Sequence, residues 1–214
     1  YGFNSLESTW ENIRNLSKGT ALFTQPASPI KGDSAPQEIM YLAEDYFRRS
    51  GQTKQIDVKF SSGMPDIFPV KKYAKKLDII CDNRGIEKTF HRDLVEVDAD
   101  NKVAIFKDTD SNELTSIKYD LLHVTPKMAT PDVIKKSLLS KEGGWVDVDD
   151  NTMQHNQYDN VFSCGDCSSL PTSKTTAAIR AQVPIMVRNI LSARNGLPIV
   201  DYYNGYTSCS IVTG

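Results

Sequence analysis

The sequence predicts an α/β fold with an inserted antiparallel β-meander. Between residues 5 and 83, amphipathic segments with helical spacing alternate with short apolar segments that are typical of strands. From residue 86 onward, short β-like runs follow one another and are separated by polar turns. This change of pattern predicts a βαβ unit followed by a three-stranded antiparallel meander.

The first elements are expected to be a helix, a strand and a second helix. Apolar residues at near-helical spacing predict an amphipathic helix over residues 5–17, and the apolar run 20–24 predicts a buried strand. The second helix is expected to begin at residues 34–37, whose Ser-x-x-Gln sequence has the form of a capping box, and to end near Gly51. Its inward-facing stripe consists of Ile39, Leu42, Ala43, Tyr46 and Phe47.

The middle of the chain is expected to complete the βαβ unit and to form the meander. Alternation over residues 55–60 predicts a strand, and residues 70–83 predict a helix that Gly85 can cap. A Thr-Pro sequence at residues 125–126 is expected to end the meander. The β-like runs lie at residues 86–91, 94–98, 102–107 and 116–125.

The C-terminal third is expected to contain two returning strands and one long helix. The strands are predicted over residues 143–148 and 161–164, and the helix over residues 177–193 with its end near Gly196. Pro184 lies inside this helix and should kink it, because proline lacks an N–H donor and clashes with the preceding turn.

Composition excludes several classes of function. The 214 residues carry a net charge of -2, so there is no basic excess to neutralise phosphates and nucleic acid is not an expected partner. The lysine pairs 71–72 and 75–76 are interpreted as a solvated helix face. No apolar run approaches the roughly 20 residues of a spanning helix.

Because Tyr1 is not an initiator residue, we expect the sequence to be a piece of a longer protein.

Residues 161–178 (VFSCGDCSSLPTSKTTAA) carry the most specific pattern in the chain. Gly165 allows a tight turn, and Asp166 offers a fixed anion to which a polyol could donate hydrogen bonds. Small and hydroxyl residues then open a helix, whose free N–H groups, together with Lys174, favour electron-rich or anionic ligand atoms. The pattern therefore predicts a flavin site, for which no metal is expected.

This segment resembles the second flavin-contacting motif of sulfide:quinone oxidoreductases of the mitochondrial type. The similarity extends over nearly the whole chain, although no G-x-G-x-x-G sequence, the usual pyrophosphate-binding element, occurs in it. Further matching segments are residues 36–42 (PQEIMYL), 70–74 (VKKYA), 122–126 (LHVTP), 144–148 (GWVDV) and 205–209 (GYTSC).

The resemblance implies a Rossmann-like (FAD/NAD(P)-binding) fold and a division of the chain into three parts. Residues 1–50 would be a connecting segment with the first helix, strand and helix. Residues 51–145 would form the second dinucleotide-like domain with its meander. Residues 146–214 would return to the FAD domain and contain the flavin-facing helix and a reactive cysteine.

The resemblance also implies roles for individual residues. The aspartate of the Gly-Asp pair hydrogen-bonds the ribityl chain of FAD, and the start of the following helix faces the isoalloxazine ring. Taken alone, a Gly-Asp pair is common at strand ends, and without the resemblance Lys174 would be interpreted as a solvated lysine. The implied cofactor-binding residues are Gly165, Asp166, Lys174, Thr175, Thr176 and Ala177.

Cysteine usage is informative because the family requires two reactive thiols. Cys209 matches the family cysteine that takes up sulfur and carries a persulfide during turnover. The second cysteine of the family lies in a Lys-Cys-Ala-Gly-Ala-Pro-Gln context. The corresponding residues 31–37 here are Lys-Gly-Asp-Ser-Ala-Pro-Gln, so Gly32 occupies the position of that thiol. Aspartate and serine cannot form a persulfide in its place.

The other three cysteines have weaker interpretations. Cys164 and Cys167 have C-x-x-C spacing, which would fit a thiol–disulfide pair or half of a zinc site. No second pair at metal spacing occurs, and we expect Cys164 to behave as a small buried hydrophobe. Cys81 is expected to do the same on the inner side of its helix.

The implied function is FAD-dependent oxidation of hydrogen sulfide to sulfane sulfur or a persulfide, with electrons passing to ubiquinone. The family uses glutathione or sulfite as sulfur acceptor and lies peripherally on the mitochondrial inner membrane, through segments that we do not find here. Gly32 predicts impaired activity. One alternative is a type II NADH dehydrogenase-like flavoprotein. Such a protein needs a nicotinamide-binding glycine fingerprint after the strand at residues 55–60, but residues 61–65 contain only one glycine. The other alternative is a non-catalytic flavoprotein remnant or scaffold domain.

Overall fold

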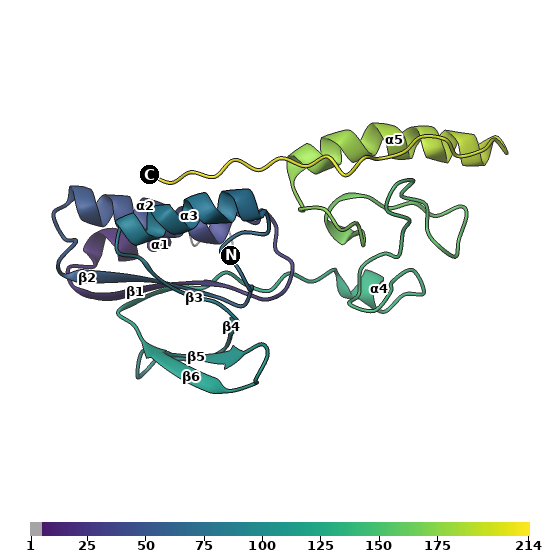
Figure 1. The fold of residues 1–214 in the computed structure, drawn as a ribbon. Helices are drawn as coiled ribbons and strands as arrows, with labels where there is room; N and C mark the ends of the chain where they lie inside the picture. The colour runs from purple at the N-terminus through teal and green to yellow at the C-terminus, as the bar shows by residue number, and fades with distance from the viewer. Residues whose placement is uncertain (1–5) are drawn as a thin grey trace. The chain divides into compact units, whose positions relative to one another are not determined.

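The computed structural model describes residues 6–214, which form two compact units (Figure 1). The first unit consists of residues 6–30, 34–127 and 211–214, and the second of residues 31–33 and 128–210. The division at residues 50 and 145 that the resemblance implies remains a prediction.

The first unit is built on a four-stranded parallel sheet with the strand order β3-β2-β1-β7. Strand β1 pairs in parallel with both β2 and β7. The predicted helices and strands of residues 6–83 are confirmed, while Ser5, the expected start of the first helix, lies outside the described residues. The elements are α1 (Leu6–Asn15), β1 (Gly19–Gln25), α2 (Ala35–Arg49), β2 (Ile56–Ser62), α3 (Lys71–Asn83), β3 (Glu87–Thr89) and β7 (Leu121–His123).

The predicted antiparallel meander is confirmed as a separate three-stranded sheet between β3 and β7. It consists of β4 (Arg92–Asp98), β5 (Val103–Asp108) and β6 (Leu114–Lys118). The single run expected over residues 116–125 is wrong, because the chain leaves the meander after β6. There the Asp120 carboxylate accepts a hydrogen bond from the Thr20 N–H at 2.8 Å, and the chain enters the parallel sheet as β7.

Strand β1 is buried on both faces from Ala21 to Gln25, which explains why three apolar residues follow one another at Ala21, Leu22 and Phe23. Figure 1 shows the helices α1, α2 and α3 on one side of the parallel sheet and the meander on the other. On the helix side, Phe23 packs in a cluster with Met40 and Tyr41. On the meander side, Leu22 packs against Phe106.

The capping box predicted for α2 does not form. Ser34 has helical backbone angles (φ -86°, ψ -22°) and makes no capping hydrogen bond through its side chain. Gln37 is fully buried, and its amide donates instead to the carbonyl of Ile67. This tertiary bond competes with the local capping bond. At the end of α3, Gly85 has a φ of +67° and acts as the predicted C-terminal cap.

The second unit has little regular structure apart from α5 (Thr176–Arg194), which confirms the predicted long helix. A one-turn helix α4 (Asp132–Lys135) and a 3-10 turn η2 (Gly165–Cys167) complete it. The helix α5 continues through Pro184, so a kink there stays a prediction. The core of this unit consists of Val146, Val148, Met153, Leu170 and Tyr203.

The returning strands predicted over residues 143–148 and 161–164 are wrong. These segments make only isolated bridges, such as Val146 with Ser168 and Gln154 with Phe162. An apolar alternating sequence favours an extended backbone, but a strand also needs a continuous partner, and none of the described residues supplies one here.

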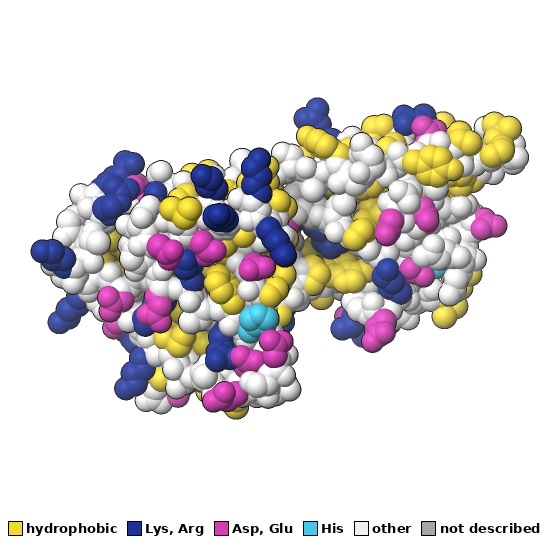
Figure 2. Space-filling model, viewed as in Figure 1, with side chains coloured by type: hydrophobic (Ala, Val, Ile, Leu, Met, Phe, Trp, Pro, Cys, Tyr) yellow, Lys and Arg dark blue, Asp and Glu magenta, His cyan; other side chains and the backbone are white. Residues whose placement is uncertain are grey.

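The surface agrees with the charge pattern of the sequence. Lysine and arginine side chains gather over α2 and α3 of the first unit (Figure 2). Lys71, Lys72, Lys75 and Lys76 are exposed, which confirms a solvated helix face. None of the helices formed by residues 6–214 combines the length and apolar character needed to cross a membrane.

Candidate flavin and sulfur site

The Gly-Asp pair lies in the 3-10 turn η2, in the second unit. Gly165 has a φ of +70°, which confirms the predicted tight turn. Its N–H donates to Oε1 of the buried Gln182 on α5 at 2.9 Å, and its carbonyl accepts from the Ser168 hydroxyl at 2.8 Å. A β-carbon at position 165 would lie 3.3 Å from the Ile179 side chain. The turn is therefore fixed against α5.

The two carboxylate oxygens of Asp166 have different environments. Oδ2 forms an ion pair with Nζ of Lys31 at 2.8 Å. Oδ1 is buried and accepts no hydrogen bond from any residue in the described range 6–214. Because an unsatisfied buried acceptor is costly, this oxygen is suited to accept a hydrogen bond from a ligand hydroxyl.

Lys174 is buried, which contradicts its interpretation as a solvated lysine. Its ammonium donates to the Ser168 carbonyl at 2.9 Å and lies 4.5 Å from the ring centroid of Trp145. Burial lowers the pKa of Lys174, while the nearby Asp166 and Cys167 act in the opposite direction. A cation held in a partly apolar environment can stabilise negative charge on a neighbouring group.

Thr175 caps the N-terminus of α5 and cannot contribute its hydroxyl acceptor freely to a ligand. Its Oγ1 accepts a hydrogen bond from the Ala178 N–H at 3.1 Å. Thr176 is exposed and Ala177 is half-buried. Their N–H groups lie in the first turn of the helix, where no intrahelical acceptor exists. The positive end of the helix dipole is thus presented by backbone groups.

Two distant segments meet at residues 173–175. The backbone of Lys31 forms a parallel bridge with Lys174, and the Ser173 hydroxyl donates to the carboxylate of Asp33. From the other segment, the Thr207 and Thr175 hydroxyls lie 2.9 Å apart. The position of the family's second thiol and the segment that ends in Cys209 therefore both adjoin the start of α5.

Gly32 has a backbone that suits glycine. Its φ is +73°, in the left-handed region that residues with a β-carbon rarely adopt. The local conformation at this position thus favours the residue that the sequence contains over a cysteine.

Cys209 is exposed and lies on a segment without regular secondary structure. Tyr203 anchors this segment, because its ring is buried in the core of the second unit and its N–H donates to the Asn151 carbonyl at 2.7 Å. Exposure gives a dissolved sulfur compound access to the Cys209 thiol.

The other cysteines are buried to different degrees. Cys81 is fully buried on α3, as predicted, and burial raises the pKa of its thiol. Cys164 and Cys167 are half-buried, so Cys164 is less enclosed than we expected. The described residues contain no group of three side chains that could hold a metal ion.

Sequence reasoning missed three residues of this site. Lys31 and Asp33 contact the motif from far along the chain, and no local pattern indicates such contacts. Gln182 could have been noticed, because a glutamine on the inward face of a helix requires a buried hydrogen-bond partner.

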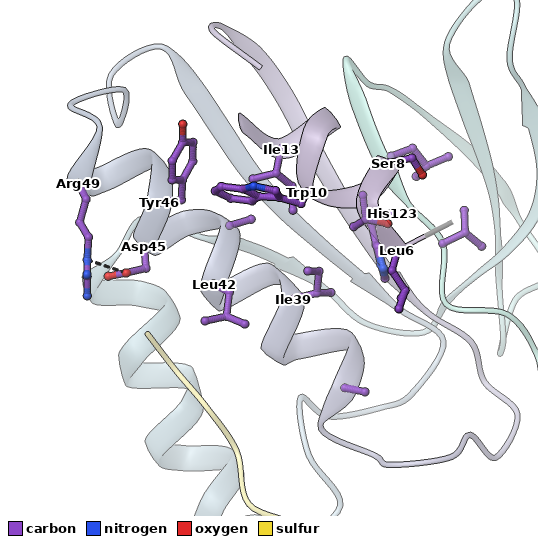
Figure 3. A pocket seen from close by; sticks show the side chains of 15 residues that line it. Leu6, Ser8, Trp10, Ile13, Ile39, Leu42, Asp45, Tyr46, Arg49 and His123 are labelled. Atoms are coloured by element: carbon purple, nitrogen blue, oxygen red, sulfur yellow. Dashed lines mark ion pairs between the residues drawn. The ribbon is translucent and has the colours of Figure 1, made fainter. Parts of the chain in front are cut away.

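An apolar groove of about 810 Å³ in the first unit was also not predicted (Figure 3). The rings of Trp10 and Tyr46 pack edge to face there, with centroids 4.9 Å apart. The Asp45–Arg49 ion pair lies at one end and His123 at the other. Its lining contains none of the residues that the sequence assigned to flavin or sulfur chemistry.

The parallel sheet with its antiparallel insertion gives the first unit a Rossmann-type fold of the kind found in FAD- and NAD(P)-binding flavoproteins. No family model matches the sequence. The chain is 45% identical over 216 residues to the mitochondrial sulfide:quinone oxidoreductase of Mus musculus and 45% identical over 215 residues to that of Dictyostelium discoideum. It belongs to the mitochondrial sulfide:quinone oxidoreductase family, as its motifs predicted.

These matches include all of the chain but only 48% and 47% of the two relatives, so the chain spans about half their length. Solved structures support the fold. The sulfide:quinone oxidoreductase of Aquifex aeolicus superposes with a TM-score of 0.72 at 13% identity, over 91% of this chain and 48% of that one. A chain of the Tetrahymena thermophila mitochondrial ATP synthase gives 0.79 at 23% identity, over 95% and 50%.

Proposed function

We propose that this chain forms the flavin-facing and sulfur-accepting part of a mitochondrial sulfide:quinone oxidoreductase. The observation that carries the proposal is its identity of 42–45% over its whole length with three relatives of that name. The reaction of that enzyme is oxidation of hydrogen sulfide to sulfane sulfur with electrons passing to ubiquinone, and this chain would retain only part of it because Gly32 replaces one thiol. The proposed location is the surface of the mitochondrial inner membrane.

FAD is the proposed cofactor, and when bound it would supply a two-electron acceptor. Asp166 would hold it, because its buried Oδ1 lacks a donor among the described residues and a ribityl hydroxyl could provide one. Gly165, which has no side chain, would allow the backbone to approach the ligand closely. The N–H groups of Thr176 and Ala177 would face the ring at the positive end of α5.

Lys174 and Thr175 would have supporting roles at the same site. The buried ammonium of Lys174 would place a positive charge near the ring and stabilise negative charge there. Thr175 would hold the first turn of α5 in place through its bond to the Ala178 N–H. These two residues position the site, while the exposed Cys209 would receive sulfur.

We propose further that the sulfide cycle of the family cannot be completed by this chain. That cycle needs two thiols that exchange sulfur, one of them at the position of Gly32. The left-handed backbone at Gly32 supports glycine as the residue to which this site is adapted. Cys209 could still accept sulfane sulfur from a persulfide or polysulfide donor and pass it to a thiol or sulfite acceptor, but it would lack the partner that transfers electrons from sulfide to FAD.

The test is sulfide-dependent reduction of a soluble ubiquinone analogue by the full-length protein that carries this sequence. We expect flavin to co-purify and sulfide to leave its absorbance unchanged, with no quinone reduction. Normal turnover would contradict the proposed impairment. Absence of bound flavin from a correctly folded protein would contradict the assignment of the cofactor site.

A second candidate is a non-catalytic flavoprotein domain that retains the fold and has lost sulfide oxidation. Gly32 favours it, since the replacement removes a reactive group while the neighbouring contacts of Lys31 and Asp33 are kept. Sulfur uptake distinguishes the two candidates. A persulfide formed on Cys209 after incubation with a sulfane sulfur donor favours a remaining enzymatic role, and an unmodified Cys209 favours the non-catalytic domain.

A further inference from the structure

Cys164 and Cys167 flank the Gly165-Asp166 pair, and the proposed function gives neither thiol a role. The 3-10 turn η2 begins directly after Cys164 and ends at Cys167, so the two cysteines lie at the two ends of one tight turn. Gly165, with its φ of +70°, makes the required reversal possible directly after the extended Cys164.

The thiol of Cys167 is directed back toward Cys164. Its Sγ lies 3.8 Å from the Cys164 carbonyl oxygen and 3.4 Å from the Ser163 hydroxyl. A disulfide needs about 4 Å between the two β-carbons and a bond of about 2 Å between the sulfurs. A turn that folds one thiol over the backbone of the other cysteine provides the proximity from which side-chain rotation can close that bond.

The surroundings differ between the two thiols. Burial raises the pKa of Cys164, and the nearby Cys167 adds to this effect. The thiolate is the form that attacks disulfides, so a raised pKa makes Cys164 the poorer attacking group. Cys167 is therefore expected to attack first, and Cys164, whose carbonyl oxygen its Sγ contacts, is placed to act second.

We propose that Cys164 and Cys167 form a redox-active dithiol that closes to a disulfide by exchange with a low-molecular-weight disulfide. The Cys167 thiolate attacks one sulfur of the small disulfide, breaks its S–S bond and releases one small thiolate. Cys164 then loses its proton to solvent and attacks Cys167. This second step forms the Cys164–Cys167 bond and releases the other small thiolate.

The exchange is balanced without any further oxidant. Two protein thiols lose two electrons, and one small disulfide gains them and becomes two thiols after proton uptake. The new bond would tie the ends of the turn that holds Asp166, so the redox state of the pair would act on the geometry of that carboxylate. Exchange itself does not depend on flavin binding, so the proposal can fail or hold independently of the proposed function.

The experiment is disulfide mapping after exposure of the purified protein to oxidised glutathione. The Cys209→Ser background removes the exposed thiol, and an acid quench followed by alkylation in denaturant labels every remaining free cysteine. Trypsin releases residues 142–174 as one peptide that contains Cys164 and Cys167 and no other cysteine. We expect this peptide to lose both alkylation sites without gaining glutathione, and dithiothreitol to restore both.

Two variants test the order of attack. Cys164→Ser should trap glutathione on Cys167, because the resolving thiol is missing. Cys167→Ser should take up glutathione at least tenfold more slowly. Cys81 should stay reduced throughout, which shows that the protein has not unfolded. Two results would overturn the proposal. One is full alkylation of both cysteines, after exposure to oxidised glutathione, in the protein that retains Cys164 and Cys167. The other is equal glutathione uptake by the two variants.

Discussion

Asp166 has one satisfied and one unsatisfied carboxylate oxygen, and this asymmetry decides its value as a ligand group. Lys31 neutralises the charge through Oδ2 from a side chain that is 69% exposed, so the ion pair itself adds little stability. The buried Oδ1 has no donor within residues 6–214. A cofactor hydroxyl that donates to it would remove a penalty of about 1–3 kcal/mol. This oxygen is the part of the site that most directly favours ligand binding.

Asp166→Ala should therefore weaken flavin binding by about tenfold or more, since a hydrogen bond to a charged group contributes about 1.5–3 kcal/mol. The measurement is flavin content per protein after gel filtration, followed by titration of the apoprotein with FAD. Glu142→Ala, which removes an exposed carboxylate in the same unit, is the matched control and should bind FAD normally. Equal retention by both variants would exclude Asp166 as a flavin ligand.

Gly32 can be tested by returning a thiol to its position. Gly32→Cys should allow sulfide to bleach bound flavin, at a cost in stability of about 1–2 kcal/mol because φ is +73° there. Gly32→Ala carries the same backbone strain without a thiol and should remain unbleached. Stopped-flow absorbance of the flavin band and urea denaturation measure the two effects. Bleaching in the alanine variant, or none in the cysteine variant, would contradict the role assigned to this position.

At the scale of elements, one ionised side chain, the carboxylate of Asp108, makes several of the polar contacts that hold the β5–β6 hairpin. The Asp108 carboxylate accepts hydrogen bonds from the Ser111 N–H at 2.8 Å and the Asp110 N–H at 2.9 Å, and Arg92 pairs with it. These bonds, with Arg92 as a smaller contribution, lower the pKa of Asp108 from 3.8 to about 2. The hairpin therefore depends on the ionised carboxylate.

Because the folded pKa of Asp108 is depressed, its contribution to stability is present above pH 3.8 and is lost as the pH falls toward 2. Asp108→Asn should thus be less stable than the parent at neutral pH, and the difference should narrow on acidification through this window. Urea denaturation at a series of pH values measures it. Glu96→Gln, which removes an exposed carboxylate on β4, is the control. Its unfolding free energy should differ little from that of the parent, and the difference should not narrow on acidification. If the difference in unfolding free energy between Asp108→Asn and the parent did not depend on pH, the stabilising role assigned to the ionised Asp108 carboxylate would be wrong.

Elements with strong periodicity were predictable from the sequence, and elements defined by distant partners were not. The helices α2, α3 and α5 follow their apolar spacing, and the meander follows its turns. The strands expected over residues 143–148 and 161–164 failed because alternation specifies an extended backbone but no partner. At the site, the Gly165 turn was foreseen locally. The burial of Lys174 was not, since it results from tertiary contacts with Trp145 and Ser168.

At the scale of the whole molecule, the hydrophobic residues form separate cores in the two units. The parallel sheet and its helices enclose one cluster, which includes Met40, and Met153 belongs to the cluster of the second unit. Both methionines are fully buried. Separate cores allow each unit to lose its structure without a direct loss of packing in the other. The proposed flavin residues all lie in the second unit. So do Gly32 and Cys209, the two positions at which the family has its reactive cysteines.

Met40→Ala and Met153→Ala form a matched pair that tests this separation. Each removes a buried side chain at a cost of about 2–5 kcal/mol. Hydrogen exchange followed by mass spectrometry should show faster exchange within residues 34–127 for Met40→Ala and within residues 128–210 for Met153→Ala. If flavin is bound by the second unit, only Met153→Ala should also lose flavin. Faster exchange in both units for either variant would mean that the chain unfolds as one cooperative body, and the flavin site would then depend on the parallel sheet as well.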